Sequence, residues 1–160
     1  MAVITISRQT FIGGQELGTH LARKLGYDYV TREDLAAEAE SLGVQVARLR
    51  DSITRPPGVR QELQRERDRY VACITMLLCE RCLKRSIVYN GHAGHMLLLG
   101  VPNLLRISAV ADLEYRINLV CERLGYTRKE AKEYILGVDV VRDRWVKYLY
   151  GVDWHSPFYY

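Results

Sequence analysis

The sequence VITISRQTFIGGQELGTHLARKLG occupies residues 3–26 and carries the clearest structural signal in the chain. The β-branched run at 3–6 is typical of a short buried strand. Gly13 and Gly14 then mark a loop, after which Leu17, Leu21 and Leu25 recur at helical spacing. Gly26 supplies a helix stop. The pattern predicts a strand, a glycine-bearing loop and a helix in direct succession.

The rest of the chain repeats this alternation. Further short strands are predicted at 27–30, 87–89 and 104–110, and helices at 31–42, 70–82 and 113–124. Thr31 with Asp34, and Thr127 with Glu130, have the spacing of helix N-caps. The last helical region, from 128, is expected to break at Gly137 and resume as a separate piece. The turn-rich stretch at 54–58 is the best internal breakpoint.

Short strands alternating with longer helices predict an α/β fold, with a short parallel sheet and helices on both faces. The length of 160 residues argues for a single domain over 1–160. The charge of +4 suits a small anionic ligand but is too weak and dispersed to predict nucleic-acid binding. With no apolar run near the ~20 residues of a membrane span and no signal-peptide pattern, we expect no membrane association and a cytoplasmic location.

Parallel sheets bind ligands beyond the carboxyl ends of their strands, where the loops after Ile6 and Tyr89 are expected to lie. A strand, a glycine loop and a helix N-terminus make an anion cradle, because free N–H groups and the helix dipole favour phosphate. The alternative is that Gly13 and Gly14 merely turn the chain.

Three stretches resemble the cytidylate kinase-like family, a branch of the P-loop nucleoside monophosphate kinases. They are ITISRQTFIGGQELGTHLARKLGYDYVTREDL at 4–35, GHAGHMLLLGVPNLLRISAVADLEYRINLVCERLGYTRKEAKEYI at 91–135 and VDVVRDRWVKYLYGVDWHSP at 138–157. The resemblance implies a three-layer α/β/α P-loop kinase fold that binds ATP with Mg²⁺. It also implies transfer of the γ-phosphoryl group to a nucleoside monophosphate such as CMP.

The first loop departs from the broader superfamily pattern G-x-x-x-x-G-K-[ST]. Arg8 stands at the first glycine, Gly13 at the second, Gly14 at the lysine and Gln15 at the Ser/Thr. These four residues and Ser7 are the predicted cofactor-binding set. Arg8 is the candidate to replace the lysine, since a guanidinium binds phosphate bidentately, and Ser7 offers a hydroxyl to the metal. A surface arginine and a strand-end serine are the plain alternatives.

The second loop supplies the predicted substrate-binding residues Gly91 and His92. The resemblance implies an arginine where His92 stands, so His92 is either a phosphate contact when protonated or a plain loop histidine. Monophosphate kinases also close arginines over the phosphates, which makes Arg142 and Arg144 the catalytic candidates, together with Arg8. A solvated helix face is the alternative for both.

Three further observations bear on function and assembly. The absent lysine and Ser/Thr favour a competing hypothesis, which is a nucleotide-binding regulatory module without turnover. A structural domain that binds no nucleotide is a third hypothesis.

Cys79 and Cys82 have C-x-x-C spacing within a helix, which indicates core-boundary residues rather than a metal site, and no resident metal is predicted. The family implies a further strand and helix after Trp154, so we expect the sheet to lack them and its exposed edge to favour a homodimer.

Overall fold

The computed structural model describes residues 1–52 and 64–160 and contains one sheet of four parallel strands. The strands are β1 (Val3–Arg8), β2 (Asp28–Thr31), β3 (Ile87–Asn90) and β4 (Leu104–Ala109), in the order β2-β3-β1-β4. Val3 of β1 lies in register with Ile87 and with Leu104. The predicted parallel α/β sheet is confirmed. The predicted breakpoint at 54–58 lies outside the described residues.

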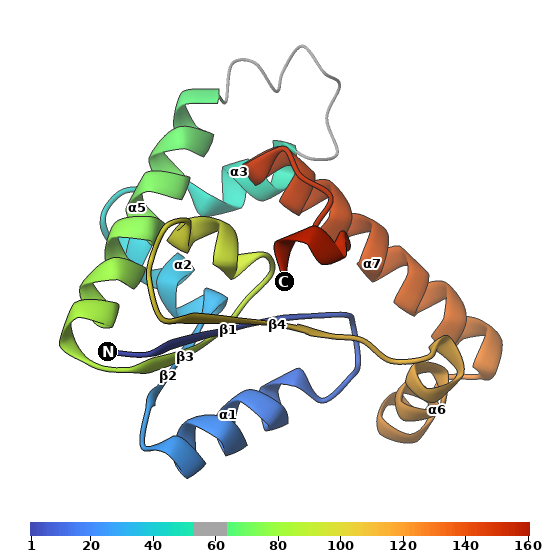
Figure 1. Cartoon of the computed structure of the whole chain (residues 1–160). Helices are drawn as coiled ribbons and strands as arrows, with labels where there is room; N and C mark the ends of the chain where they lie inside the picture. Colours follow the sequence, from blue (N-terminus) through green and yellow to red (C-terminus); the bar gives the residue numbers. More distant parts are fainter. Residues whose placement is uncertain (53–63) are drawn as a thin grey trace.

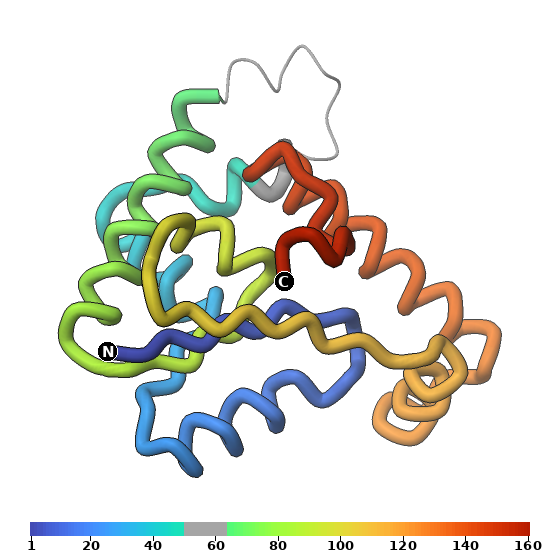
Figure 2. Tube along the Cα trace, in the orientation of Figure 1, coloured from blue at the N-terminus to red at the C-terminus, as the bar shows by residue number. Residues whose placement is uncertain are grey.

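Helices cover both faces of the sheet (Figures 1 and 2). Helix α1 (Gly14–Leu25) covers one face, whereas α2 (Arg32–Ser41), α3 (Val46–Ser52), α5 (Gln64–Lys84) and the 3₁₀ helix η1 (Gly94–Leu98) lie on the other. The chain then forms α6 (Leu113–Leu124), α7 (Arg128–Tyr150) and a last 3₁₀ turn, η2 (Pro157–Tyr159). Among the described residues, none of these helices has the length and apolar character needed to span a bilayer.

The strand periodicity of two divides the core between the two faces of the sheet. Ile4, Ile6 and Val88 pack with Ala22 beneath the sheet, on the α1 side. Their neighbours point the other way, into the larger cluster formed mainly with α2, α3 and α5, whose strand members are Val3, Val30, Ile87, Tyr89 and, partly buried, Leu104. Successive residues at the end of a strand therefore face different environments, which bears directly on Ser7 and Arg8.

Both predicted capping pairs are present. The Thr31 side chain accepts from the Asp34 N–H at 3.1 Å and the Thr31 N–H donates to Asp34 at 2.8 Å. Thr127 and Glu130 form the same reciprocal pair at the start of α7. Gly26 ends α1 in the left-handed conformation, with φ +68°. These helix boundaries follow from local hydrogen bonding, which explains why the sequence pattern locates them.

The predicted break at Gly137 is wrong, because α7 continues from Arg128 to Tyr150. Ala131 and Ile135 on one side of the glycine pack against α6, and Trp145 and Leu149 on the other side pack in the main core. Burial at both ends holds the intervening turns helical, at a local cost of about 1 kcal/mol for glycine.

His95 joins η1 to the end of β1. Its ring is 1% exposed, and Nδ1 lies 3.5 Å from the Ser7 hydroxyl. The ring of Tyr160 covers it at a centroid separation of 4.7 Å. Burial, with Arg106 as a second cause, lowers the pKa of His95 to about 4. The histidine is therefore neutral in the folded protein.

We predict that Gly137→Ala stabilises the protein. A Cβ at this position meets nothing within 4 Å, and the helical backbone suits alanine. The free energy of unfolding should rise by about 0.5–1 kcal/mol, measurable by urea denaturation. A loss of stability would show that α7 is not continuous through this residue.

We also predict that His95 makes the free energy of unfolding decrease as the pH is lowered. Because its pKa is lower in the folded than in the unfolded chain, the unfolded state alone takes up a proton below pH ~6.5, which favours unfolding. The contribution of neutral His95 to the free energy of unfolding is fully present above pH ~6.5. It decreases by up to about 1.4 kcal/mol for each pH unit between pH ~6.5 and pH ~4. His95→Gln should remove this part of the slope between pH 6.5 and 5 in denaturation experiments, whereas His20→Gln, at an exposed position, should not. Equal slopes in the two variants would contradict the assignment.

Candidate functional site

The first loop presents backbone N–H groups at the start of α1. Gly13 is the N-cap residue with φ +71° and supplies no side-chain cap, while the Glu16 carboxylate contacts the backbone of the first helical turn. Phe11 also adopts the left-handed region, with φ +54°. A helix N-terminus without a side-chain cap leaves donors available to an anion. The predicted succession of strand, glycine-bearing loop and helix is present in the structure.

Arg8 lies across the first residue of α1. A Cβ built on Gly14 would fall 1.8 Å from the Cδ of Arg8, so the glycine is what admits this side chain. The Arg8 Nε donates to the Asn90 Oδ1 at 3.1 Å. Gly14 stands at the sequence position of the missing lysine, and the aliphatic chain of Arg8 fills the space where such a side chain would begin. The structure thus brings Arg8, Gly13 and Gly14 together.

Asn90 fixes this arrangement and was not among the residues that the sequence analysis selected. Its Nδ2 donates to the Gly14 carbonyl at 3.2 Å and to the Tyr29 hydroxyl at 2.7 Å. With the bond from Arg8, its side chain connects the ends of β1 and β3, residue Tyr29 of β2 and the start of α1. Its place at the carboxyl end of β3, directly before Gly91, is the signal that could have identified it.

A cavity of about 240 Å³ opens beside the loop. It is lined by Arg8, the stretch 10–16, Arg123 from α6 and Arg142 from α7. Gln15 is one of the lining residues and is itself exposed at the rim. Arg123 pairs with Glu16 at 3.1 Å at the mouth. Three arginines from three different elements therefore surround a loop of backbone donors.

Arg142 is the unusual member of this set. The residue is half-buried, and its Nη1 atom is buried without a hydrogen-bond partner among the described residues. Burial and the nearby Arg8 lower its pKa to about 10, partly offset by Asp139. Arg144 lies two residues further along α7, about 200° around the helix, and is exposed. The structure places Arg142 at the cavity and Arg144 away from it.

Asp139 holds the loop from the α7 side and was also missed by the sequence analysis. Its carboxylate accepts from the Thr10 N–H at 3.3 Å and from the Arg116 Nη1 at 2.6 Å. Burial alone would raise the pKa of Asp139, but the hydrogen bonds from Thr10 and Arg116 bring it below its ordinary value. The residue lies mid-helix in a mixed charge run, so no local pattern distinguishes it.

The second loop packs on the Tyr89 ring. Cβ atoms at Gly91 and Gly94 would lie 2.4 Å and 2.1 Å from Tyr89 atoms, so both glycines serve this close approach. Between them, His92 is buried, and its ring lies 6.0 Å from that of Trp154. Trp154 in turn donates to Asp143 at 2.8 Å, which anchors the segment after α7 against the loop.

Ser7 lies on the opposite face of the sheet from Arg8. Its hydroxyl faces His95 and the end of the chain, and it does not line the 240 Å³ cavity.

Among the described residues no group of three or more His, Cys, Asp or Glu side chains could hold a metal. Cys79 and Cys82 are partly buried against the main core, as predicted. The cavity beside the first loop is thus lined by arginines and backbone N–H donors.

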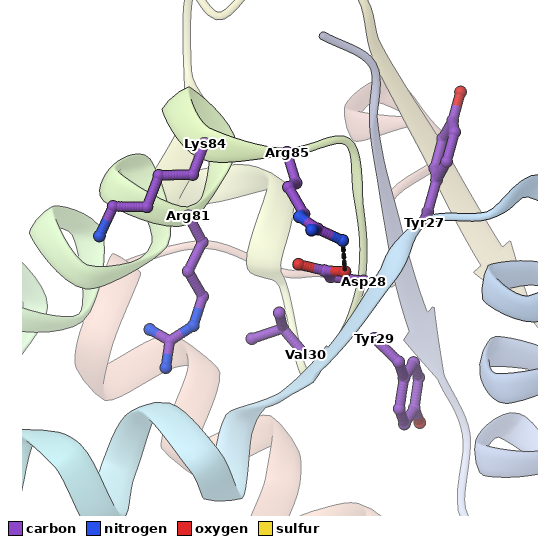
Figure 3. Close-up of a pocket in the computed structure, with 7 residues that line it drawn as sticks. All are labelled: Tyr27, Asp28, Tyr29, Val30, Arg81, Lys84 and Arg85. Carbon is purple, nitrogen blue, oxygen red and sulfur yellow. Dashed lines mark ion pairs between the residues drawn. The ribbon is translucent and has the colours of Figure 1, made fainter.

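A larger hollow of about 540 Å³ lies at the other end of the sheet (Figure 3). It is lined by the start of β2 and by Arg81, Lys84 and Arg85 at the end of α5. Arg81 pairs with Glu38 at 2.5 Å and Arg85 with Asp28 at 3.5 Å, so two of these three cations already have carboxylate partners. Its position at the amino-terminal edge of the strands makes it a weaker candidate than the first-loop cavity.

Comparisons with known proteins bear on the family and the fold of the chain. The sequence model of the cytidylate kinase-like family matches residues 3–160. No curated protein matches the chain.

Solved structures resemble the chain in fold. An uncharacterized protein from Eubacterium ventriosum ATCC 27560 superposes with a TM-score of 0.74 at 21% identity, covering 99% of this chain and 85% of that one. TT1252 from Thermus thermophilus gives a TM-score of 0.45 at 20% identity, covering 81% of this chain and 76% of that one. The first likeness shows the shared fold.

We predict that Gly14→Ala weakens the binding of a polyphosphate anion at the cavity beside the first loop. The new methyl group would displace the Arg8 side chain and break its bond to Asn90. Loss of one charge-assisted contact should reduce the affinity for inorganic tripolyphosphate roughly tenfold or more, measured by isothermal titration calorimetry. Gly137→Ala, a helical glycine with open space around it, is the matched control and should bind as the wild type does. Unchanged affinity in Gly14→Ala would place the anion elsewhere.

Proposed function

The chain belongs to the cytidylate kinase-like family, and we propose that it is a nucleotide kinase that transfers the γ-phosphoryl group of ATP to a nucleoside monophosphate. The triphosphate would bind at the first loop. The acceptor would bind near the second loop, at Gly91 and His92. Family membership supports a nucleotide kinase-like fold, and the more specific activity rests on the site described above.

The observation that carries the proposal is the buried Nη1 atom of Arg142, which has no hydrogen-bond partner among the described residues and lies at the cavity beside Gly13 and Gly14. A buried cationic group without a partner is costly unless a ligand supplies one. The donors around it are N–H groups and guanidinium groups, which bind phosphate oxygens well. A polyphosphate is the ligand class that satisfies this set.

Arg8 supports turnover despite the absent lysine. Held by Asn90 across Gly14, its guanidinium would contact the phosphates that a P-loop lysine contacts. Asp139 would keep the loop in place through Thr10. The charge is thus supplied from the strand end rather than from the helix start.

The reaction needs positioning and charge neutralisation rather than a covalent intermediate. An acceptor phosphate oxygen forms a bond to the γ-phosphorus while the bond from that phosphorus to the bridging oxygen of ADP breaks. Arg8 and Arg142 would stabilise the negative charge on the transferring group and the departing ADP. Mg²⁺ would supply further charge neutralisation as part of the ATP complex.

A second candidate function is nucleotide binding without turnover. It is favoured by Gly14 and the exposed Gln15, which stand at the lysine and Ser/Thr positions of the superfamily pattern. In that case the same cavity would bind ATP and Arg142 would contribute to affinity alone.

We predict that Arg142→Met lowers turnover far more than Arg144→Met. The two arginines share α7, but only Arg142 lines the cavity. Loss of the cavity guanidinium should reduce kcat/KM by at least roughly a hundredfold, against a few-fold for Arg144. The measurement is nucleoside diphosphate formation from Mg²⁺-ATP with CMP and the other common monophosphates.

The outcomes separate the candidate functions. Diphosphate formation that depends on Arg142 supports the kinase. Saturable ATP binding without any diphosphate formation supports the binding module. No binding at millimolar ATP would contradict both.

A further inference from the structure

Glu16 is the acidic residue at the cavity beside the first loop. Among the described residues that line this cavity it carries the only carboxylate, and the other charged residues there are Arg8, Arg123 and Arg142. It belongs to the first turn of α1, where an acid stabilises a helix through the macrodipole. That role explains an acid at this position but not the direction in which its side chain points.

The two carboxylate oxygens of Glu16 lie against both sides of the cavity mouth. Oε1 accepts from the Arg123 Nη1 of α6 at 3.1 Å. A Cβ built on Gly13 would lie 3.7 Å from Oε2, so this oxygen lies beside the N-cap residue of α1. Hydrogen bonding to the helix backbone is the main cause that lowers the pKa of Glu16, followed by the bond from Arg123. An ionised carboxylate therefore uses the N–H and guanidinium donors that suit phosphate oxygens.

The Arg123–Glu16 pair costs little to break. Its side chains are 51% and 62% exposed, and water solvates both charges when they separate. A phosphate group carries more charge than a carboxylate and presents more acceptor oxygens, which makes it the stronger partner for a guanidinium. A polyphosphate that enters the cavity can therefore replace Glu16 as the partner of Arg123.

Resting on the proposed nucleotide site, we propose that Glu16 is a placeholder carboxylate, which a polyphosphate displaces from Arg123 when it binds. Without ligand, Glu16 neutralises Arg123 and lies beside the N–H donors of the first loop. With ligand, one phosphate group binds Arg123 and the Glu16 side chain moves into solvent. Arg123 is thus a further phosphate-binding residue, in addition to Arg8 and Arg142.

The placeholder role gives Glu16 opposite effects on fold stability and on ligand affinity. The pair with Arg123 must break on binding, and the carboxylate repels a polyanion that lies close to it. Glu16→Gln should therefore bind inorganic tripolyphosphate about three- to tenfold more tightly at low salt, and this gain should shrink as salt is raised. A residue that only supported the start of α1 would leave the affinity unchanged or lower it when replaced.

The test is a double-mutant cycle on the whole chain, with tripolyphosphate affinity measured by isothermal titration calorimetry. The variants are Glu16→Gln, Arg123→Met and the two substitutions combined. Arg123→Met should lower the affinity by a factor roughly two- to fivefold larger in the Glu16→Gln background than in the wild type. The reason is that the wild type alone spends part of the Arg123–phosphate energy on breaking the pair with Glu16. Equal factors in the two backgrounds would overturn the inference.

The Glu114–Arg128 pair provides the matched control. It is also an exposed pair between a glutamate and an arginine of different helices, and neither residue lines the cavity. Glu114→Gln removes the same charge from the chain and should leave the tripolyphosphate affinity as in the wild type. A gain as large as that of Glu16→Gln would show a general effect of net charge and would contradict the placeholder role.

A second measurement uses the unsubstituted protein. The side-chain carboxyl ¹³C resonance of Glu16 should shift as tripolyphosphate saturates the site, because the carboxylate loses its bond from Arg123. A resonance that stays in place at saturation would overturn the inference while leaving the phosphate site intact. If neither tripolyphosphate nor Mg²⁺-ATP binds to the wild type or to Glu16→Gln, the proposed function and this inference are both wrong.

Discussion

The Arg8 side chain lies across Gly14, and the rest of the site depends on this close approach. Any side chain at residue 14 would occupy the same space, since even a Cβ falls 1.8 Å from the Arg8 Cδ. Asn90 completes the contact by accepting from Arg8 and donating to the Gly14 carbonyl. One glycine and one buried amide thus set where a guanidinium lies relative to the helix N-terminus.

Around this contact the protein buries cationic and polar groups that its own side chains leave unsatisfied. The Arg142 Nη1 atom and both nitrogens of His92 have no partner among the described residues. Such groups lower the stability of the unliganded fold, because each loses hydration without gaining a hydrogen bond. A ligand that supplies phosphate oxygens would recover part of that cost, so ligand affinity and fold stability are linked at this edge of the sheet.

Much of the fold follows from local patterns. Periodicity and capping residues predict the strands, the helix ends at Gly26 and Thr127, and the parallel sheet, because these features depend on neighbouring residues and on general chain handedness. The continuity of α7 through Gly137 does not follow from them. Its two halves are held by different packing partners, α6 and the main core, and no local signal records those contacts.

The candidate site also contains some residues that the sequence alone identifies and others whose roles depend on the tertiary structure. The sequence alone locates the first loop with its glycines and Arg8, because a strand, a glycine turn and a helix start are consecutive in the chain. Tertiary packing determines which way each side chain points. Ser7 faces His95, whereas Arg8 lies against Gly14. Arg142 lines the cavity, whereas Arg144 is exposed to solvent. Asn90 and Asp139 gain their roles through distant partners, which include Gly14 at 76 residues from Asn90 and Thr10 at 129 residues from Asp139. A sequence pattern reports spacing along the chain, whereas these contacts depend on how the sheet and α7 are packed together.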